Sequence, residues 1–321
     1  MIVGNNQLMK SNVVESIDGK YQIAGAHNNY IYASSDWGGT WGTLTGSGTR
    51  SWADLAISET GQYMTAVIGG GFIYTSSNYG VTWTERATAL SWYVVSISST
   101  GQYQSAIIND SNTNPWTSND YGVTWIERTG NEEYWISISI SSTGQYQYAV
   151  PSGDYPYSSS DYGVTWVKET GAVNASWSAS ASSGDGKYVT GLVYAGSNYI
   201  YYSSDFGVTF TTATSSGLYS WISVDMSLTG QYQYAIAYLG GAIYSLFKST
   251  DYGVTWTMLS PPSKAWQKVA CSGSGKYVSI TFGGASSYIH VSTDYGITWT
   301  AKSSTGSRIW RGLSINKTLD L

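Results

Sequence analysis

Runs of alternating apolar and polar residues recur along the chain. In the run that opens at Trp135, isoleucine occupies positions 136, 138 and 140, and serine occupies positions 137, 139 and 141. A strand points successive side chains to opposite faces, so this period of two predicts β-strands. No stretch has the period of a helix. Seven such runs open with Trp, at Trp52, Trp92, Trp135, Trp177, Trp221, Trp266 and Trp310.

Each run begins a unit of four predicted strands. Nine residues after six of the seven Trp residues comes a glycine, as at Gly61, and a tyrosine follows two positions later, as at Tyr63. Glycine adopts a positive φ at little cost, so it predicts a tight turn into a second strand. A short aromatic third strand, such as residues 72–74, and a fourth strand, such as residues 82–86, complete the unit.

An eight-residue phrase stands between the third and fourth strands of every unit. Its fullest form is Ser-x-Asp-Tyr-Gly-Val-Thr-Trp, and successive copies begin 42, 42, 41, 44, 46 and 43 residues apart. A period of this length belongs to a propeller blade or a solenoid unit. The pattern therefore predicts an all-β fold, a seven-bladed β-propeller of four-stranded antiparallel blades, with residues 1–321 as a single domain. The copies begin at Ser34, Ser76, Ser118, Ser159, Ser203, Ser249 and Ser292.

The two ends of the chain are expected to share one blade. Lys10 stands where the first unit would have its Trp, whereas residues 309–315 form a spare strand with no glycine turn after it. We expect this C-terminal strand to become the innermost strand of the first blade, because a closed ring leaves no exposed sheet edge. Residues 13–16, Val-Val-Glu-Ser, compete for the same position.

The repeated phrase resembles the Asp-box, or bacterial neuraminidase repeat (BNR), of sialidase-like propellers, and the resemblance covers nearly the whole chain. In that family the phrase is a turn at the periphery, away from the ligand face. Its Asp and Ser side chains can bond backbone groups of the turn. Asn78 at the Asp position and Phe210 at the Trp position preserve these mechanics. The resemblance therefore implies a structural role for Asp36, Asn78, Asp120, Asp161, Asp205, Asp251 and Asp294.

Sialidase activity is not expected. Family sialidases hold the substrate carboxylate with three arginines, use a Tyr–Glu pair as nucleophile and an Asp as acid/base, and carry an Arg-Ile-Pro motif. The sequence has no Arg-Ile-Pro. Of its five arginines, three flank first-strand Trp residues and are placed to approach the ligand face: Arg50, Arg308 and Arg311.

Several carboxylates and aromatic residues gather in one sector of the loops opposite the Asp-boxes. Acids beside aromatic platforms suit sugar binding or glycoside cleavage, and their oxygens also suit Ca²⁺. Solvated loop acids are the simpler interpretation. The seven first-strand Trp residues, likewise, either line pockets near this face or wedge between blades as core. The candidate ligand-binding residues are Asp110, Trp116, Glu132, Glu133, Trp135, Asp154 and Tyr155.

Composition narrows the classes of function. The net charge is −5 and no basic run exists, which excludes a nucleic-acid stripe and disfavours an anionic membrane surface. The sequence shows no signal peptide and no transmembrane segment, so we expect a cytoplasmic protein or one exported by a non-classical route. Cys271 is the single cysteine, and neither His27 nor His290 has metal-ligand spacing. We expect no metal and no cofactor.

These patterns favour a non-enzymatic interaction propeller. It is expected to bind a protein or glycan partner through the loop face opposite the Asp-boxes, because the repeats show no catalytic constellation. The alternative is a glycan-active protein, a lectin or a glycoside hydrolase, that uses the sector around Glu132, Glu133 and Asp154.

Overall fold

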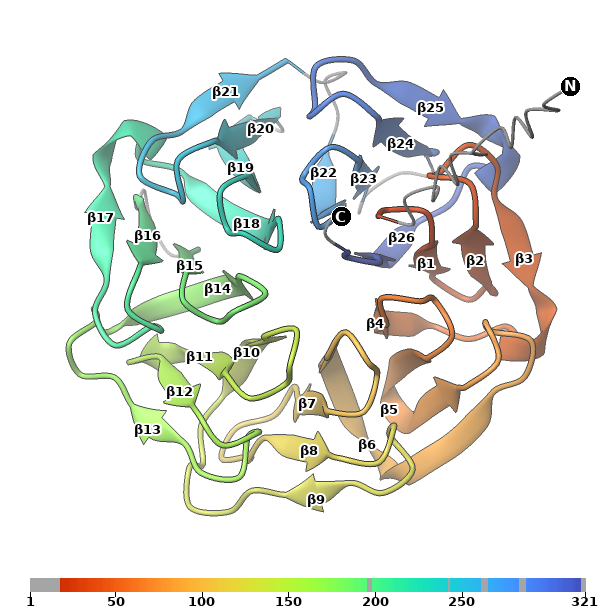
Figure 1. Cartoon of the computed structure of the whole chain (residues 1–321), viewed down its shortest axis with the longest axis horizontal. Coiled ribbons are helices and arrows are strands. Elements are labelled where there is room, and N and C mark those ends of the chain that lie inside the picture. The colour runs from red at the N-terminus through yellow and green to blue at the C-terminus, as the bar shows by residue number, and fades with distance from the viewer. Residues whose placement is uncertain (1–17, 195–197, 242, 261–264, 283–286, 319–321) are drawn as a thin grey trace, which may run out of the picture.

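The computed structural model describes residues 18–194, 198–241, 243–260, 265–282 and 287–318. Over these ranges the chain forms antiparallel β-sheets and three short 3-10 helices, as the alternating pattern predicted. Figure 1 shows the sheets arranged as a ring around a common axis. None of the helices in the described ranges has the length and apolar character that crossing a lipid bilayer requires.

Three of the sheets have four strands. The first contains, in spatial order, β26 (Trp310–Ile315), β1 (Gln22–Ala26), β2 (Ile31–Ser34) and β3 (Gly42–Leu44). The second contains β18 (Ser220–Met226), β19 (Gln233–Gly240), β20 (Ile243–Ser249) and β21 (Thr257–Leu259). The third contains β22 (Trp266–Cys271), β23 (Val278–Phe282), β24 (Ile289–Ser292) and β25 (Thr300–Lys302). The three 3-10 helices are η1 (Thr45–Ser47), η2 (Thr214–Ser216) and η3 (Ser303–Thr305).

Two further sheets are larger. The six-stranded sheet contains β4 (Trp52–Ile57), β5 (Met64–Ser76), β6 (Thr84–Ile97), β7 (Gln104–Ile108), β8 (Trp116–Ser118) and β9 (Ile126–Glu127). The eight-stranded sheet runs β13 (Val167–Lys168), β12 (Tyr157–Ser159), β11 (Gln147–Asp154), β14 (Ala175–Ser182), β15 (Val189–Val193), β16 (Ile200–Ser203) and β17 (Thr211–Ala213), with β10 (Trp135–Ile140) on β11.

The sheets are therefore not seven separate four-stranded units. β5 pairs with β4 through its first half and with β6 through its second half, and β6 continues into the next repeat. β11 likewise extends beyond its partner β10 to pair with β14, through Ser152 opposite Ser176. These strand pairings between units could not be predicted, because the strands extend into the loop between two units, and that loop carries no repeated sequence pattern.

The first and last strands of the described residues pair in the first sheet. β26 pairs antiparallel with β1, with Leu313 opposite Ala24, which confirms that the C-terminal strand completes the first unit. The competing residues 13–16 lie outside the described residues. Cys271 is fully buried in β22, as expected of a small apolar side chain.

The first-strand Trp residues form the core between neighbouring repeats. All seven are at most 2% exposed. Trp135 is typical, since its indole Nε1 donates to the Thr113 carbonyl of the preceding repeat at 2.8 Å and its ring meets Tyr157 edge-on at 5.0 Å. Their burial supports the interpretation of these rings as core.

The ring has two chemically different faces. The turns between first and second strands share one side with the copies of the repeated phrase, which we call Asp-boxes after the turn that they resemble. Tyr121 N–H donates to the Gln102 carbonyl at 3.1 Å, and the Tyr121 ring stacks on Tyr63 at 4.5 Å. We call this side the turn face. The loops between second and third strands, and those between repeats, lie at the other ends of the strands, and we call that side the loop face.

A belt of hydrogen bonds links successive turns on the turn face. The N–H of Glu59 donates to the Ser99 carbonyl, and the same backbone contact recurs from turn to turn as far as Leu228 and Gly273. The belt differs where the first and last described strands meet, which we call the seam. There the acceptor is a side chain and not a backbone carbonyl: Gly273 N–H donates at 2.6 Å to the carboxylate of Asp18. Asp18 is fully buried. At the other end of the belt Asn316 Nδ2 donates to the Glu59 carbonyl at 2.7 Å, so the side chains of Asp18 and Asn316 complete the belt at the seam.

Candidate functional site

Each Asp-box is a self-contained hydrogen-bonded turn. In the third copy Asp120 accepts hydrogen bonds from Ser118 Oγ at 2.8 Å and from both the N–H and the hydroxyl of Thr124 at 2.9 and 2.7 Å. Gly122 N–H donates to Ser118 Oγ, and Trp125 Nε1 donates to the Gly122 carbonyl. Asn78 substitutes for Asp by accepting from Thr82 N–H and donating to the Thr82 hydroxyl. These contacts occupy the Asp carboxylates within their own turns.

The carboxyl groups of the Asp-boxes are more acidic than an ordinary Asp. Burial raises the pKa of each, but the hydrogen bonds from Thr and Ser in its own turn outweigh burial and leave the pKa lowered. This holds for Asp36, Asp120, Asp161, Asp205, Asp251 and Asp294.

The fold is expected to lose stability in acid through these groups. A folded-state pKa below the ordinary value of 3.8 means that the unfolded chain takes up protons first as the pH falls. Their stabilisation is therefore complete above pH 3.8 and is lost as the pH falls through the lowered folded-state pKa values.

Asp120→Asn, which copies the natural Asn78, is expected to keep neutral-pH stability within about 1 kcal/mol. Urea unfolding between pH 6 and 2.5 should show a shallower acid loss for the variant than for the wild type; a parallel curve would contradict this.

Two of the predicted acids converge on a lysine on the loop face. Lys168 Nζ lies 2.5 Å from Asp154 Oδ2 and 3.6 Å from Glu133 Oε1. The hydroxyl of Tyr157 donates to Glu133 at 2.7 Å. Burial and this hydrogen bond to Glu133 raise the pKa of Tyr157 to about 12, and ion pairing with Asp154 raises the pKa of Lys168. Burial raises the pKa of Asp154, but Lys168 outweighs it and lowers that pKa.

This arrangement is an ion-pair network, which differs from a catalytic pair of carboxylates. A glycoside hydrolase needs one carboxylic acid with a raised pKa and a second, free carboxylate. Here Asp154 is held ionised by Lys168, and Glu133 is occupied by Tyr157 and Lys168. Tyr157 is also buried, so it is not exposed as a nucleophile.

The remaining predicted residues do not join the network. Asp110 is exposed and accepts from Ser111 N–H at 2.8 Å, and Glu132 is exposed and accepts from Gly130 N–H at 3.3 Å. Trp116 packs edge-on against Trp92 at 5.6 Å. Tyr155 contacts Asp154 through its backbone N–H. Trp135 is fully buried, so its ring belongs to the core and presents no surface to a ligand.

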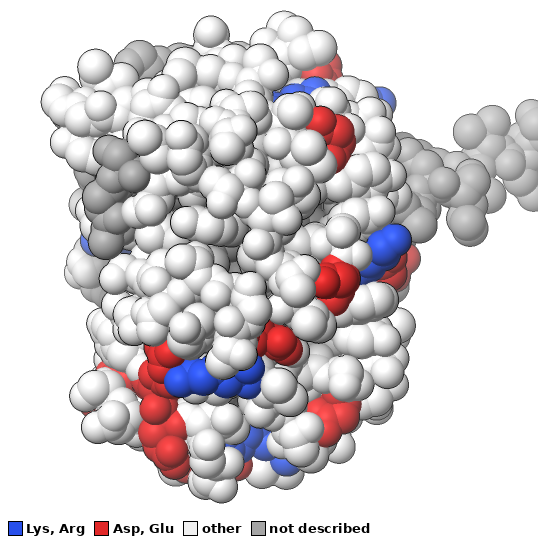
Figure 2. Space-filling view, turned by 90° about the vertical axis from the view of Figure 1, so that its left-hand side faces the viewer, with Lys and Arg blue, Asp and Glu red and all other residues white. Residues whose placement is uncertain are grey.

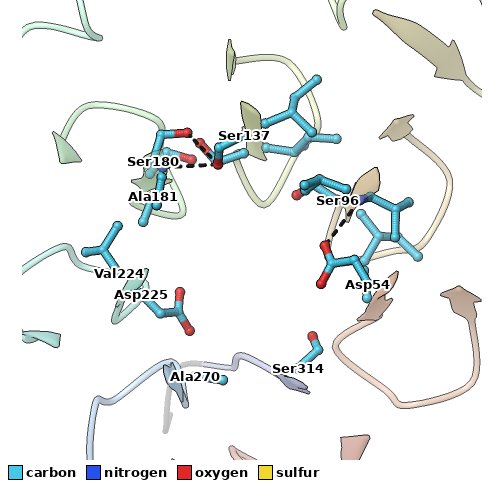
Figure 3. Close-up of a pocket in the computed structure, with 18 of the residues that line it drawn as sticks. Asp54, Ser96, Ser137, Ser180, Ala181, Val224, Asp225, Ala270 and Ser314 are labelled. Carbon is cyan, nitrogen blue, oxygen red and sulfur yellow. Dashed lines mark hydrogen bonds between the residues drawn. The ribbon is translucent and has the colours of Figure 1, made fainter. Parts of the chain in front are cut away.

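A polar cavity of about 330 Å³ fills the centre of the ring. It is lined by the strands that begin at the seven Trp residues. Figure 3 shows Ser96, Ser137, Ser180 and Ser314 around it, with the carboxylates of Asp54 and Asp225 on different sides. We call this cavity the central channel.

Two ion pairs cross the seam of the ring inside the channel. Lys317 Nζ lies 2.6 Å from Asp225 Oδ1 and also donates to the Met226 carbonyl. Burial lowers the pKa of Lys317, but the Asp225 carboxylate outweighs burial and leaves that pKa raised. Lys268 Nζ lies 3.9 Å from Asp54 Oδ1, and burial raises the pKa of Asp54 despite this lysine.

The channel opens on the loop face through a second cavity of about 270 Å³, which we call the channel mouth. Three basic side chains line it: His27, Lys268 and Arg311. Tyr93 and Gln267 line both the mouth and the channel. Among the predicted arginines, Arg311 therefore lies on the loop face, at the channel mouth.

The other two predicted arginines lie against aromatic rings. The Arg50 guanidinium lies over the ring of Tyr74 at 4.3 Å, and that of Arg308 over Tyr32 at 4.7 Å. Both also donate to backbone carbonyls a few residues earlier, at Ser47 and Thr305. They stabilise the loops in which they lie, so three arginines do not converge on one point.

The chain is similar to known proteins in structure but not in sequence. No protein-family model and no curated protein sequence matches the chain. The GH74 xyloglucanase of Xanthomonas campestris aligns with 92% of this chain at 13% identity and a TM-score of 0.67, and the chain spans about half (52%) of that enzyme. YCF48 bound to a D1 peptide aligns at 13% identity over 78% of this chain and 81% of its own, with a TM-score of 0.58. The β-propeller domain of Cps50 (Swd1) from Myceliophteria thermophila aligns at 10% identity over 82% and 90%, with a TM-score of 0.59. The fold is a β-propeller.

Charged side chains are sparse on this propeller. Figure 2 shows one flank, where red and blue atoms are scattered or adjoin each other instead of forming a patch of one sign. Within the described ranges, no group of three or more His, Cys, Asp or Glu side chains is placed to hold a metal ion.

The charged residues inside the propeller were not predicted from the sequence. Asp54 and Lys268 stand two positions after the first-strand Trp, and Asp225 stands four positions after it, where other repeats have Ser, Ala, Val or Gly. The signal that could have identified them is a charged residue at an inner-strand position where the other repeats have a small or apolar residue. Lys317 carried no such signal, since it follows the last strand.

Proposed function

We propose that this chain is a seven-bladed propeller whose Asp-boxes are structural turns, and that it binds a partner through its loop face. One observation supports this most: the channel mouth places the basic side chains of His27, Lys268 and Arg311 around a single cavity on that face. Lys268 has a carboxylate nearby, at 3.9 Å, whereas none of the described carboxylates forms an ion pair with the exposed side chains of His27 and Arg311. The mouth is thus suited to an acidic group of the partner.

Exposed tyrosines extend this surface. Tyr93 and Tyr134 flank first-strand Trp residues on the loop face and are each 39% exposed. Tyr194 and Tyr288 lie in loops between second and third strands and are also exposed. Tyr and Arg are the residue types that contribute most to protein–protein contacts, so a protein partner with an acidic segment is favoured. The neighbour YCF48, bound to a D1 peptide, offers a precedent for peptide binding by this fold.

A charge reversal at the mouth tests the proposal. The probes are a glutamate-rich peptide and, in parallel, uronic-acid oligosaccharides. Arg311→Glu is expected to weaken peptide binding at least tenfold, or about 1.4 kcal/mol, and the wild-type affinity should fall with added salt. The matched control is Lys187→Glu, which reverses an exposed cation on the turn face.

The outcomes separate the alternatives. Binding of the peptide but not of the oligosaccharides supports a protein partner, and the reverse supports a glycan partner. Equal losses in Arg311→Glu and Lys187→Glu, or no binding of either probe, would contradict the proposal. Isothermal titration calorimetry measures both affinities.

A further inference from the structure

One lysine on the turn face lies among three tyrosine rings. Lys248 Nζ lies 5.3 to 6.0 Å from the centres of three aromatic rings, those of Tyr232, Tyr234 and Tyr295. It also donates to the Tyr295 carbonyl at 3.0 Å. An ammonium group within about 6 Å of the centre of an aromatic ring is attracted to its face. The three rings therefore form a cation site, which the chain fills with its own lysine.

A second group of three aromatic rings has the same arrangement: Tyr146, Tyr148 and Phe206. The Tyr146 and Phe206 rings lie 4.8 Å apart at an interplanar angle of 38°. The matching rings of Tyr232 and Tyr295 lie 5.0 Å apart at 41°. Tyr146 is partly exposed and Phe206 is 38% exposed, so a ligand in solution can reach this pair.

The third ring of each group is held in the same way. The Tyr148 hydroxyl donates to the Gly186 carbonyl at 2.6 Å, and the Tyr234 hydroxyl donates to the Gly275 carbonyl at 2.8 Å. Each of these glycines lies in the turn between the first and second strands of the next repeat. The five other repeats have a residue without an aromatic ring at this position: Ile23, Thr65, Ser105, Thr190 and Ser279.

The two groups differ at the position that supplies the cation. Tyr234 of β19 stands opposite Lys248 of β20, whereas Tyr148 of β11 stands opposite Ser158 of β12. Serine lacks the aliphatic chain and the ammonium group of lysine. Lys187, in the neighbouring turn, lies over the ring of Tyr188 at 5.2 Å instead. The second group of rings is therefore a copy of the lysine site without its lysine.

A carboxylate adds negative charge beside the second group. Glu169 stands where the repeat of Lys248 has Leu259, and it accepts a hydrogen bond from the Ser158 hydroxyl. Glu169 is 9% exposed, and none of the described lysines or arginines forms an ion pair with it. Burial raises the pKa of Glu169, and the Asp205 carboxylate adds to this rise, despite the hydrogen bond from Ser158. A bound cation would offset both effects.

We propose that this second group of rings, together with Ser158 and Glu169, binds a primary alkylammonium group, either of a free alkylamine or of a lysine side chain. The ammonium takes the place that Lys248 Nζ occupies in the matching group. It donates to the Phe206 carbonyl, as Lys248 donates to that of Tyr295. A quaternary ammonium fits less well, because it has no N–H to donate. We call this the open ammonium site; it lies on the turn face, away from the partner surface proposed above.

Saturation-transfer NMR with n-butylammonium, a close analogue of the lysine side chain, tests the open ammonium site in the full chain. The wild type is expected to bind it saturably at pH 7 and low salt, and to bind tetramethylammonium about threefold more weakly. Ser158→Lys, which copies Lys248, should weaken binding by about tenfold, because its own side chain would cover the rings. The matched control is Ser160→Lys, which adds the same charge at an exposed position of the same Asp-box and should bind as the wild type does.

A second variant removes the carboxylate and leaves the rings in place. Glu169→Leu, which copies Leu259, should weaken binding of n-butylammonium by about fivefold through the lost charge. Nα-acetyl-lysine methylamide separates the two sources of the ammonium group. Binding as tight as that of n-butylammonium, or tighter, supports a lysine side chain, and weaker binding supports a free alkylamine.

Three results would overturn the inference. The first is no saturation transfer to n-butylammonium in the wild type. The second is unchanged binding in both Ser158→Lys and Glu169→Leu. The third is tetramethylammonium binding as tight as that of n-butylammonium. Arg311→Glu is not expected to change this binding, so failure of this site and failure of the partner surface are distinguishable.

Discussion

Asp18→Ala is expected to lower the free energy of unfolding by about 3–5 kcal/mol, because it leaves several buried hydrogen-bond donors without an acceptor and each costs roughly 1–3 kcal/mol. The Asp18 carboxylate accepts hydrogen bonds from the N–H groups of Gly273, Ser274 and Thr318 and from the Ser274 hydroxyl, at 2.6 to 3.2 Å. Truncation would leave these donors unpaired at the seam of the ring. Urea unfolding followed by tryptophan fluorescence measures the change.

A second aspartate on the turn face supplies the control. Asp185 accepts from Ser183 Oγ and Lys187 N–H within its own turn and is exposed. Asp185→Ala should therefore cost less than about 1 kcal/mol, because water replaces the lost partner. Asp18→Asn should fall between the two, since the amide keeps one acceptor oxygen. If Asp18→Ala cost no more than Asp185→Ala, the buried carboxylate would not be what closes the belt.

Trp135→Ala is expected to destabilise the propeller by about 3–5 kcal/mol, the range for truncating a large buried aromatic side chain. The Trp135 ring is fully buried, and it packs on Tyr157 at 5.0 Å and Trp166 at 6.5 Å. Its Nε1 hydrogen bond to the Thr113 carbonyl connects two successive repeats. Thermal and urea unfolding of the variant should both shift.

The neighbouring residue provides a matched aromatic control. Tyr134 is 39% exposed, and its hydroxyl donates to Asn109 at 2.6 Å on the surface. Tyr134→Ala should cost about 1 kcal/mol or less, in the usual range for surface changes. A Trp135→Ala variant that unfolds like the wild type would refute the assignment of this indole to the core.

The fold could be predicted because its signals are local and repeated. Alternation in runs such as Trp135–Ile140 marked the inner strands, and the Ser-x-Asp-x-Gly-x-Thr-Trp phrase marked the turns, whose hydrogen bonds lie within eight residues. The pairing of β26 with β1 followed from a count of strands. The pairing of β11 with β14 did not, because it depends on how far a strand continues past its turn.

The candidate sites were predicted only in part, because they depend on contacts between distant residues. The loops that carry Glu133 and Asp154 were recognised, but the lysine that neutralises both acids, Lys168, lies on a short outer strand with no distinguishing pattern. Asp225 and Lys317 meet across 92 residues. Ring closure sets such distances, and no local spacing in the sequence encodes them.

The seam also determines how the molecule presents itself when it is attached to something else. Asp18 and Thr318, the first and last described residues, are hydrogen-bonded to each other and both contact the turn at Gly273. An anchor fused before Asp18 or after Thr318 would therefore leave from the Asp-box side. Immobilised by either end, the protein would turn its channel mouth and exposed tyrosines away from the support, so a biosensor surface made in this way would display the loop face to a partner in solution.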